Sequence, residues 1–175
     1  MFKNQFKISR KFMIFLTYFI PISLMVAYGA DSYRFKGPKH QAPETSRAVV
    51  LFRSKCKEYK IEDICNEGFQ NLVSIELTNH IYYQTPKKGI TTIGLTEFSA
   101  FTPRTKITID SRLMMDDVLF DSTVIHELGH AILKLNHCDD KSAIMNSELL
   151  DFITMKKNYN KLIDEMFQDF VNNLN

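Results

Sequence analysis

The stretch DSTVIHELGHAILKL, residues 121–135, sets the fold of this chain. Its apolar residues recur at intervals of three and four, and this spacing predicts a helix with a wide apolar face. Asp121 and Ser122 are the expected N-cap residues, because short polar side chains accept hydrogen bonds from the first turn of a helix. The pattern therefore predicts a largely buried helix from about residue 121 to residue 135.

The motif His126-Glu127-Leu128-Gly129-His130 lies within this predicted helix. Residues four apart on a helix lie on one face, so both imidazoles can bind one Zn²⁺ at distances of about 2.0–2.1 Å. Glu127 can then reach a metal-bound water, whose pKa zinc lowers toward about 7, and pass its proton to a leaving amine. We therefore expect His126 and His130 to be metal ligands and Glu127 to be the base in peptide hydrolysis.

A catalytic zinc usually has three protein ligands and one open position. His137, which follows His130 after six intervening residues, is the leading candidate for the third ligand. Asn136 precedes it, and asparagine tolerates the left-handed conformation, so we expect the chain to turn there and bring His137 back toward the metal. The other candidates for the third ligand are Cys138, Asp139, Asp140 and Glu148.

Residues 126–145, HELGHAILKLNHCDDKSAIM, resemble the active-site region of the metzincin peptidases of the zincin clan, the matrixin-like ones especially. Members of that family carry HExxHxxGxxH, followed by a tight turn with a methionine beneath the metal. The resemblance implies a zincin-like fold with a Zn²⁺ cofactor, Glu127 as the general base and Met145 as the turn methionine. It also implies that the zinc ligands are His126, His130 and His137.

Two features of this stretch differ from the family pattern. The third histidine lies one residue further along, which gives HExxHxxxxxxH, and Leu133 or Lys134 stands where the family has a glycine. A helix that runs one residue further and turns at Asn136 would accommodate both differences. We therefore expect the same three-histidine site at the end of a slightly longer helix.

The rest of the chain carries both strand and helix patterns. Alternating apolar and polar residues, or runs of β-branched residues, predict strands at 72–77, 91–98 and 105–109, and helical spacing predicts helices at 46–59 and within 150–172. Together these elements predict an α+β domain, and the resemblance implies a small mixed sheet with an active-site helix, a Met-turn and a C-terminal helix. By the same resemblance, residues 94–98 would be an edge strand that pairs with an extended substrate.

The N-terminal segment has the features of a targeting sequence. Basic residues precede an apolar stretch, residues 12–27, and small residues follow in Ala27-Tyr28-Gly29, an order typical of a secretory signal peptide. The stretch is also nearly long enough to cross a bilayer of roughly 30 Å, so we expect residues 1–30 to be a signal peptide or a membrane anchor. Either one would place the following residues outside the cytoplasm, where the protein would be secreted, periplasmic or anchored.

Residues 31–45 are polar and contain Gly37, Pro38 and Pro43, which predicts a linker. We expect residues 46–175 to form the zincin-like metallopeptidase domain. Beyond residue 30 the chain has 18 basic and 20 acidic residues. This balance does not favour a nucleic-acid partner, and none is expected.

The chain contains three cysteines, an odd number. Cys56 and Cys65 could close a short loop, which is compatible with an oxidising compartment. Cys138 follows the expected third ligand directly, and its role stays open between a metal ligand, an inhibitory thiol and an ordinary half-buried residue.

These patterns favour a zinc-dependent endopeptidase, a monomeric metalloprotease that hydrolyses peptide or protein substrates through a water activated by Glu127. It would meet a membrane only through its N-terminal anchor, if the anchor is retained. The alternative is a non-catalytic zincin-like metal-binding domain that serves in protein interaction. A third hypothesis, a zinc chelation or delivery protein, would call for further clusters of histidine or cysteine, and the sequence has none.

Overall fold

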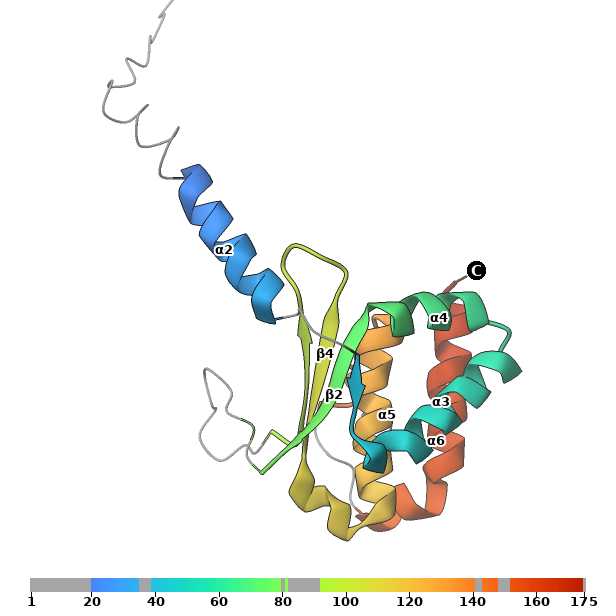
Figure 1. Ribbon diagram of the computed structural model, residues 1–175. Coiled ribbons are helices and arrows are strands. Elements are labelled where there is room, and N and C mark those ends of the chain that lie inside the picture. The colour runs from blue at the N-terminus through green and yellow to red at the C-terminus, as the bar shows by residue number, and fades with distance from the viewer. Residues whose placement is uncertain are drawn as a thin grey trace, which may run out of the picture.

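The computed structural model of the chain combines helices with one small sheet, as an α+β domain does. The expected fold class is therefore confirmed. The helices α3 to α6 lie on one side of the sheet (Figure 1). The structure describes residues 20–34, 39–79, 81, 92–140, 143–147 and 152–174.

Within the described residues, four strands form the sheet in the order β1-β2-β4-β3. Their bounds are His40–Gln41 for β1, Leu72–Thr78 for β2, Gly94–Phe98 for β3 and Thr105–Asp110 for β4. The pairs β1–β2 and β2–β4 are parallel, whereas β3 is antiparallel to β4. In this described sheet the segment 94–98 is thus at the edge, the place that the resemblance implied for it, and it is antiparallel to its neighbour.

The helix that carries the HELGH motif, α5, lies at the centre of the domain and contacts the sheet and the other three helices of the layer (Figure 1). Of its 17 residues, 12 are buried, which explains why apolar residues surround the two histidines. The helices of this layer are α3 (Ser46–Glu58), α4 (Glu62–Asn71), α5 (Asp117–Leu133) and α6 (Phe152–Asn172). Short 3₁₀ helices span Pro43–Thr45 and Ser111–Met115.

Helix α5 begins earlier than the sequence pattern predicted. Its N-cap is Asp116, whose carboxylate accepts hydrogen bonds from two backbone N–H groups of the first turn, both at 3.0 Å. The expected caps, Asp121 and Ser122, are instead buried inside the helix. Asp121 is held there by an ion pair with Arg47 of α3, so a tertiary contact accounts for the acid that looked like a cap.

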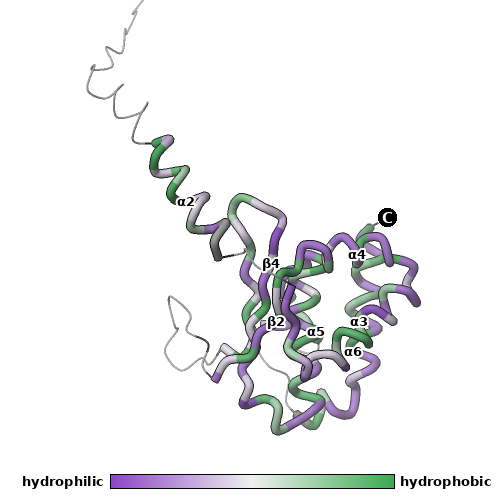
Figure 2. The backbone as a smooth tube through the Cα atoms, in the orientation of Figure 1, coloured by the Kyte–Doolittle hydropathy of each residue, from purple (hydrophilic) through white to green (hydrophobic). Residues whose placement is uncertain are grey.

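The buried face of the sheet follows the alternation of the sequence. Ile75 of β2 lies opposite Ile107 of β4 in the parallel register, and Ile109 lies two residues further along the same face. All three are almost fully buried. Figure 2 shows hydrophobic and hydrophilic stretches alternating along α3, α4 and α6, as expected for helices that cover a core on one face only.

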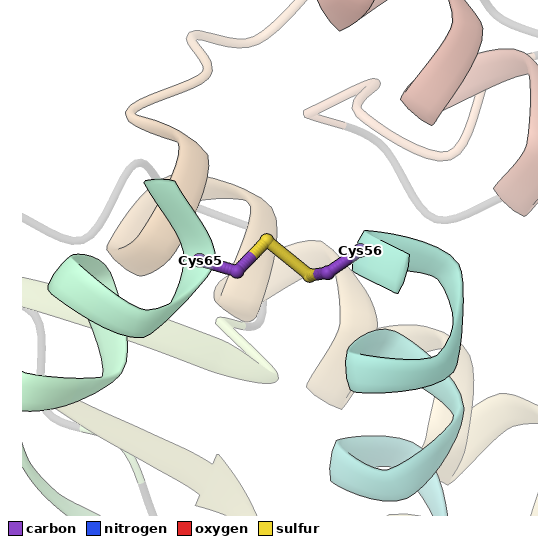
Figure 3. The surroundings of a disulfide bond; sticks show 2 residues. All are labelled: Cys56 and Cys65. Atoms are coloured by element: carbon purple, nitrogen blue, oxygen red, sulfur yellow. A yellow bond between two sulfur atoms is a disulfide. The ribbon is translucent and has the colours of Figure 1, made fainter. Parts of the chain in front are cut away.

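A disulfide joins Cys56 of α3 to Cys65 of α4, with the two Cα atoms 6.3 Å apart (Figure 3). The loop that the sequence suggested is therefore closed. In the chain-entropy description, a cross-link across so short a loop stabilises the folded state by about 2.5 kcal/mol. The bond fixes the corner between two helices that both pack on α5.

Gly68 of α4 packs directly on the backbone of α5. A Cβ atom at this position would lie 2.8 Å from Cα and 2.9 Å from the carbonyl oxygen of Ile132, and neither backbone atom can rotate away. We expect Gly68→Ala to lower the unfolding free energy by about 1–2 kcal/mol, because the overpacking outweighs the roughly 1 kcal/mol that alanine gains in a helix. Urea unfolding of the variant would measure this difference.

The matched control is Gly29→Ala in α2 (Ile20–Arg34), where a Cβ atom would meet nothing within 4 Å. This control should leave the unfolding of the domain unchanged. A Gly68→Ala variant as stable as the wild type would mean that α4 and α5 can separate without cost.

The N-terminal expectations are only partly covered by the described residues. Residues 1–19 lie outside them, and α2 contains the rest of the apolar stretch, with its hydrophobic residues concentrated toward the N-terminus (Figure 2). In the part of the chain that is described, no helix is both long and apolar enough to cross a membrane.

Part of the expected linker is built into the domain. Strand β1 pairs with β2, and the N–H of Ala42 donates to the carbonyl of Ile75 at 3.0 Å. Ala42 and Thr45 are both buried. The prediction of a linker over residues 31–45 is therefore wrong for this part, because a two-residue strand is too short to produce an alternating pattern.

Candidate metal centre

Three histidine side chains converge at the C-terminal end of α5. His126 and His130 are half-buried on one face of the helix, and His137 reaches them from the segment that follows it. The Nε2 atoms of His126 and His130 are 3.0 Å apart, and the Nε2 of His137 lies 3.1 Å from each. Among the described residues these three alone form a group that could hold a metal ion, as the sequence predicted.

The chain leaves α5 and turns back toward its histidines at Lys134, whose φ of 57° lies in the left-handed region. Helix α5 ends at Leu133, and the backbone N–H groups of Lys134 and Leu135 donate to the carbonyl of Gly129. The prediction of a longer helix that turns at Asn136 is therefore wrong. A lysine performs the turn, at a cost of about 1–2 kcal/mol for a residue with a side chain in this conformation.

The two helical histidines are oriented by backbone carbonyls. Nδ1 of His126 donates to the carbonyl of Ile144 at 2.7 Å, and Nδ1 of His130 donates to the carbonyl of Leu135 at 2.6 Å. A carbonyl oxygen only accepts, so each Nδ1 must carry the proton. In the neutral rings both Nε2 atoms therefore present bare lone pairs, the form in which histidine binds a metal.

The three ring nitrogens of this cluster are arranged as ligands of one cation would be. Burial lowers the pKa of His126 to about 4, with the neighbouring imidazoles adding to the shift, and burial also lowers the pKa of His130. At neutral pH two lone pairs then face each other at 3.0 Å with no proton between them. His137 can donate one proton to only one of them, whereas a metal ion accepts all three lone pairs at once.

A turn at residues 143–146 is hydrogen-bonded to the segment that carries His137. The N–H of Asn146 donates to the carbonyl of Ala143 at 3.2 Å, and the N–H of Cys138 donates to the carbonyl of Met145 at 3.1 Å. Met145 is buried against α5, since a Cβ atom at Gly129 would lie 2.8 Å from its sulfur. The expected turn methionine thus packs against α5 at Gly129, the residue before His130, and the glycine provides the space for it.

Glu127 lies on a different face of α5 and is only 5% exposed. Its Oε2 accepts a hydrogen bond of 2.6 Å from the hydroxyl of Thr96 on β3, and its Oε1 packs against Gly94 of the same strand. Burial raises the pKa of Glu127 to about 7, although the hydrogen bond from Thr96 opposes the shift. The sequence did not single out Gly94 or Thr96, but their alternate positions on a predicted edge strand could have done so.

The other candidates for the third ligand are not part of the cluster. Among the described residues, Cys138, Asp139 and Asp140 all lie outside the three-histidine group. Cys138 is a free thiol, 3.9 Å from the carbonyl of Asp140. Glu148 falls outside the described residues.

A family model described as a family of unknown function (DUF6639) matches residues 63–165, which is more than half of the chain. This match includes the three histidines and Glu127. No curated protein and no solved structure matches the chain.

Proposed function

The chain belongs to the DUF6639 family, whose function is unknown, and from its histidine cluster we propose that it is a zinc-dependent endopeptidase. The observation that carries this proposal is the convergence of three Nε2 atoms within 3.1 Å of one another. In His126 and His130 a carbonyl accepts a hydrogen bond from Nδ1, so that Nε2 keeps a free lone pair. This is the arrangement of histidines in a three-histidine metal site. Three neutral nitrogen ligands favour Zn²⁺ over the harder cations that prefer oxygen.

The proposed reaction divides the work between the cluster and Glu127. His126, His130 and His137 would hold the metal, which when bound would polarise the scissile carbonyl and lower the pKa of a coordinated water. Glu127 would take a proton from the water as its oxygen bonds to the scissile carbonyl carbon, and would then deliver that proton to the amine nitrogen as the C–N bond breaks.

The edge strand β3 supports a peptide as the substrate. Within the described residues, β3 is the last strand on its side of the sheet, with β4 as its neighbour. A peptide that added to this edge would run beside the strand whose inner face contacts Glu127. We therefore propose extended peptide or protein segments as substrates of a monomeric enzyme.

We also propose that the domain works outside the cytoplasm. The Cys56–Cys65 disulfide supports this location, since such bonds persist in oxidising compartments. The basic and then apolar order of residues 1–30, which is typical of a signal peptide or an anchor, supports it independently.

The first test is whether hydrolysis depends on the metal. We expect the full 175-residue chain to bind about one zinc per molecule and to cleave fluorescein-labelled casein. Chelation should abolish the cleavage and added Zn²⁺, but not Mg²⁺, should restore it, because Mg²⁺ prefers oxygen ligands. Mass spectrometry would measure the bound zinc, and release of fluorescence would measure the cleavage of casein. A folded protein that takes up no zinc after reconstitution would refute the proposal.

A non-catalytic zincin-like domain is the alternative to an enzyme, and it would bind the metal without cleaving the substrate. Zinc uptake alone is common to both functions. Cleavage that requires the metal and also requires the Glu127 carboxylate belongs to the enzyme only.

A further inference from the structure

Strand β3 contacts Glu127 with two side-chain positions, Gly94 and Thr96, that alternate along the strand. Their partners in β4 are Ile109 and Ile107, which are fully buried, so these positions face α5 and not the solvent. The neighbouring positions 95 and 97 point to the opposite face of the sheet. One short strand thus brings two residues to the same carboxylate.

Thr96 restrains one oxygen of that carboxylate. Its hydroxyl lies 2.6 Å from Oε2 of Glu127 and 3.1 Å from the backbone carbonyl oxygen of the same residue. A hydroxyl has one proton to donate, and the carboxylate oxygen is both the nearer and the stronger of the two acceptors. Thr96 therefore restrains the rotation of the Glu127 side chain about its terminal bonds.

Gly94 provides the space for the other oxygen. A Cβ atom at this position would lie 2.5 Å from Oε1, 2.9 Å from Cγ and 3.0 Å from Cδ of Glu127. Real side chains do not approach so closely, so any larger residue would push the carboxylate out of its place. The glycine is required here by a close approach and not by an unusual backbone angle, since Gly94 lies within regular strand.

We propose that Gly94 and Thr96 are positioning residues that hold the Glu127 carboxylate in one orientation for the reaction, an inference that rests on the proposed peptidase function. A base with three free side-chain torsions would spend most of its time misplaced, and a shift of about 1 Å can cost about 100-fold in rate. The same strand offers its outer edge to the substrate, so the substrate and the base are aligned on a common support.

The test compares Thr96→Val, which removes the hydroxyl but keeps the shape, with Thr96→Ser, which keeps the hydroxyl. We expect Thr96→Val to lower kcat for casein cleavage about tenfold with little change in KM, Thr96→Ser to restore most of it, and Gly94→Ala to lower kcat about 10- to 100-fold. Zinc content should stay at the wild-type level in all three, because neither Gly94 nor Thr96 belongs to the three-histidine group. Thr108→Val, on the opposite face of β4, is the matched control and should leave kcat unchanged.

A second measurement requires neither metal nor substrate. In metal-free protein labelled with ¹³C at glutamate carboxyl groups, the resonance that Glu127→Gln removes belongs to Glu127. Thr96→Val should shift this resonance and Thr96→Ser should return it toward the wild-type position, because the hydrogen bond to Oε2 changes only in the first.

Three outcomes would overturn the inference in different ways. An unshifted resonance in Thr96→Val would show that the hydrogen bond from Thr96 to Glu127 does not form in solution. A wild type that cleaves casein, with Thr96→Val and Gly94→Ala equally active, would remove the positioning role while leaving the peptidase proposal intact. A zinc-loaded wild type that cleaves nothing would overturn the peptidase proposal, and the role assigned to both residues would fall with it.

Discussion

Glu127→Gln is expected to reduce peptide hydrolysis about 1,000-fold while leaving the bound zinc in place. Glutamine keeps the size of the side chain, and its amide oxygen can still accept the hydrogen bond from Thr96, so the packing against β3 is preserved. An amide cannot take a proton from the attacking water, and only the proton transfer is lost. Casein cleavage and zinc content, measured on the same preparation, separate the two effects.

The matched control for this variant is Glu165→Gln on α6. Glu165 is half exposed and pairs with Lys161 at 3.1 Å on the same helix, remote in sequence from the histidines. Its substitution changes the net charge as Glu127→Gln does and should leave hydrolysis unchanged. If Glu127→Gln cleaves casein as fast as the wild type, the base is another group, and if neither protein cleaves, the non-catalytic alternative is favoured.

His137→Ala is expected to lower the zinc affinity by at least about 100-fold, beyond the roughly 10- to 100-fold loss typical of residues that only support a ligand. His137 provides one of the three converging Nε2 atoms and is exposed to solvent, so its removal opens the site without leaving a cavity in the core. Competition with a fluorescent zinc indicator would measure the affinity, and casein hydrolysis should fall in parallel.

His40→Ala on β1 is the control for a general effect of removing a histidine, since His40 is exposed and does not belong to the three-histidine group. Both variants should unfold at the same urea concentration as the wild type when all three proteins are metal-free. Full zinc retention by His137→Ala would contradict the three-histidine site and would direct attention to Asp139, Asp140 and Glu148.

The strands that the sequence predicted are found within a few residues of their expected bounds. The alternation in residues 72–77 and 105–109 became β2 and β4 because one face of each strand is buried, through Ile75 in β2 and Ile107 and Ile109 in β4. The strand predicted from residue 91 begins at Gly94, and residue 91 lies outside the described residues. Local periodicity was sufficient here, since burial of one face leaves a direct trace in the sequence.

Helix α4 and strand β1 were not predicted from the sequence, and both are short. Helix α4 has ten residues, and its buried residues Cys65, Gly68 and Phe69 recur at intervals of three and four, a helical spacing that was not recognised in the sequence. Strand β1 has two residues and exists only through its pairing with β2. The pairing of β1 cannot be read from neighbouring residues, because its partner strand lies elsewhere in the chain.

The sequence by itself determined the chemistry of the candidate centre. The spacing of His126 and His130 places two imidazoles on one helical face whatever surrounds the helix. Glu127 follows His126 directly on the same helix. The nearby His137 was the best third ligand by type and position, and the structure brings it within 3.1 Å of both.

Only the tertiary structure decided how that centre is held. The return of His137 depends on a left-handed Lys134, and the ring orientations depend on carbonyls of Leu135 and Ile144. The environment of Glu127 depends on a strand about 30 residues earlier in the chain, through Thr96 at 2.6 Å. These contacts join segments that are distant along the chain or turn against local preference, and so no local pattern of residues could have specified them.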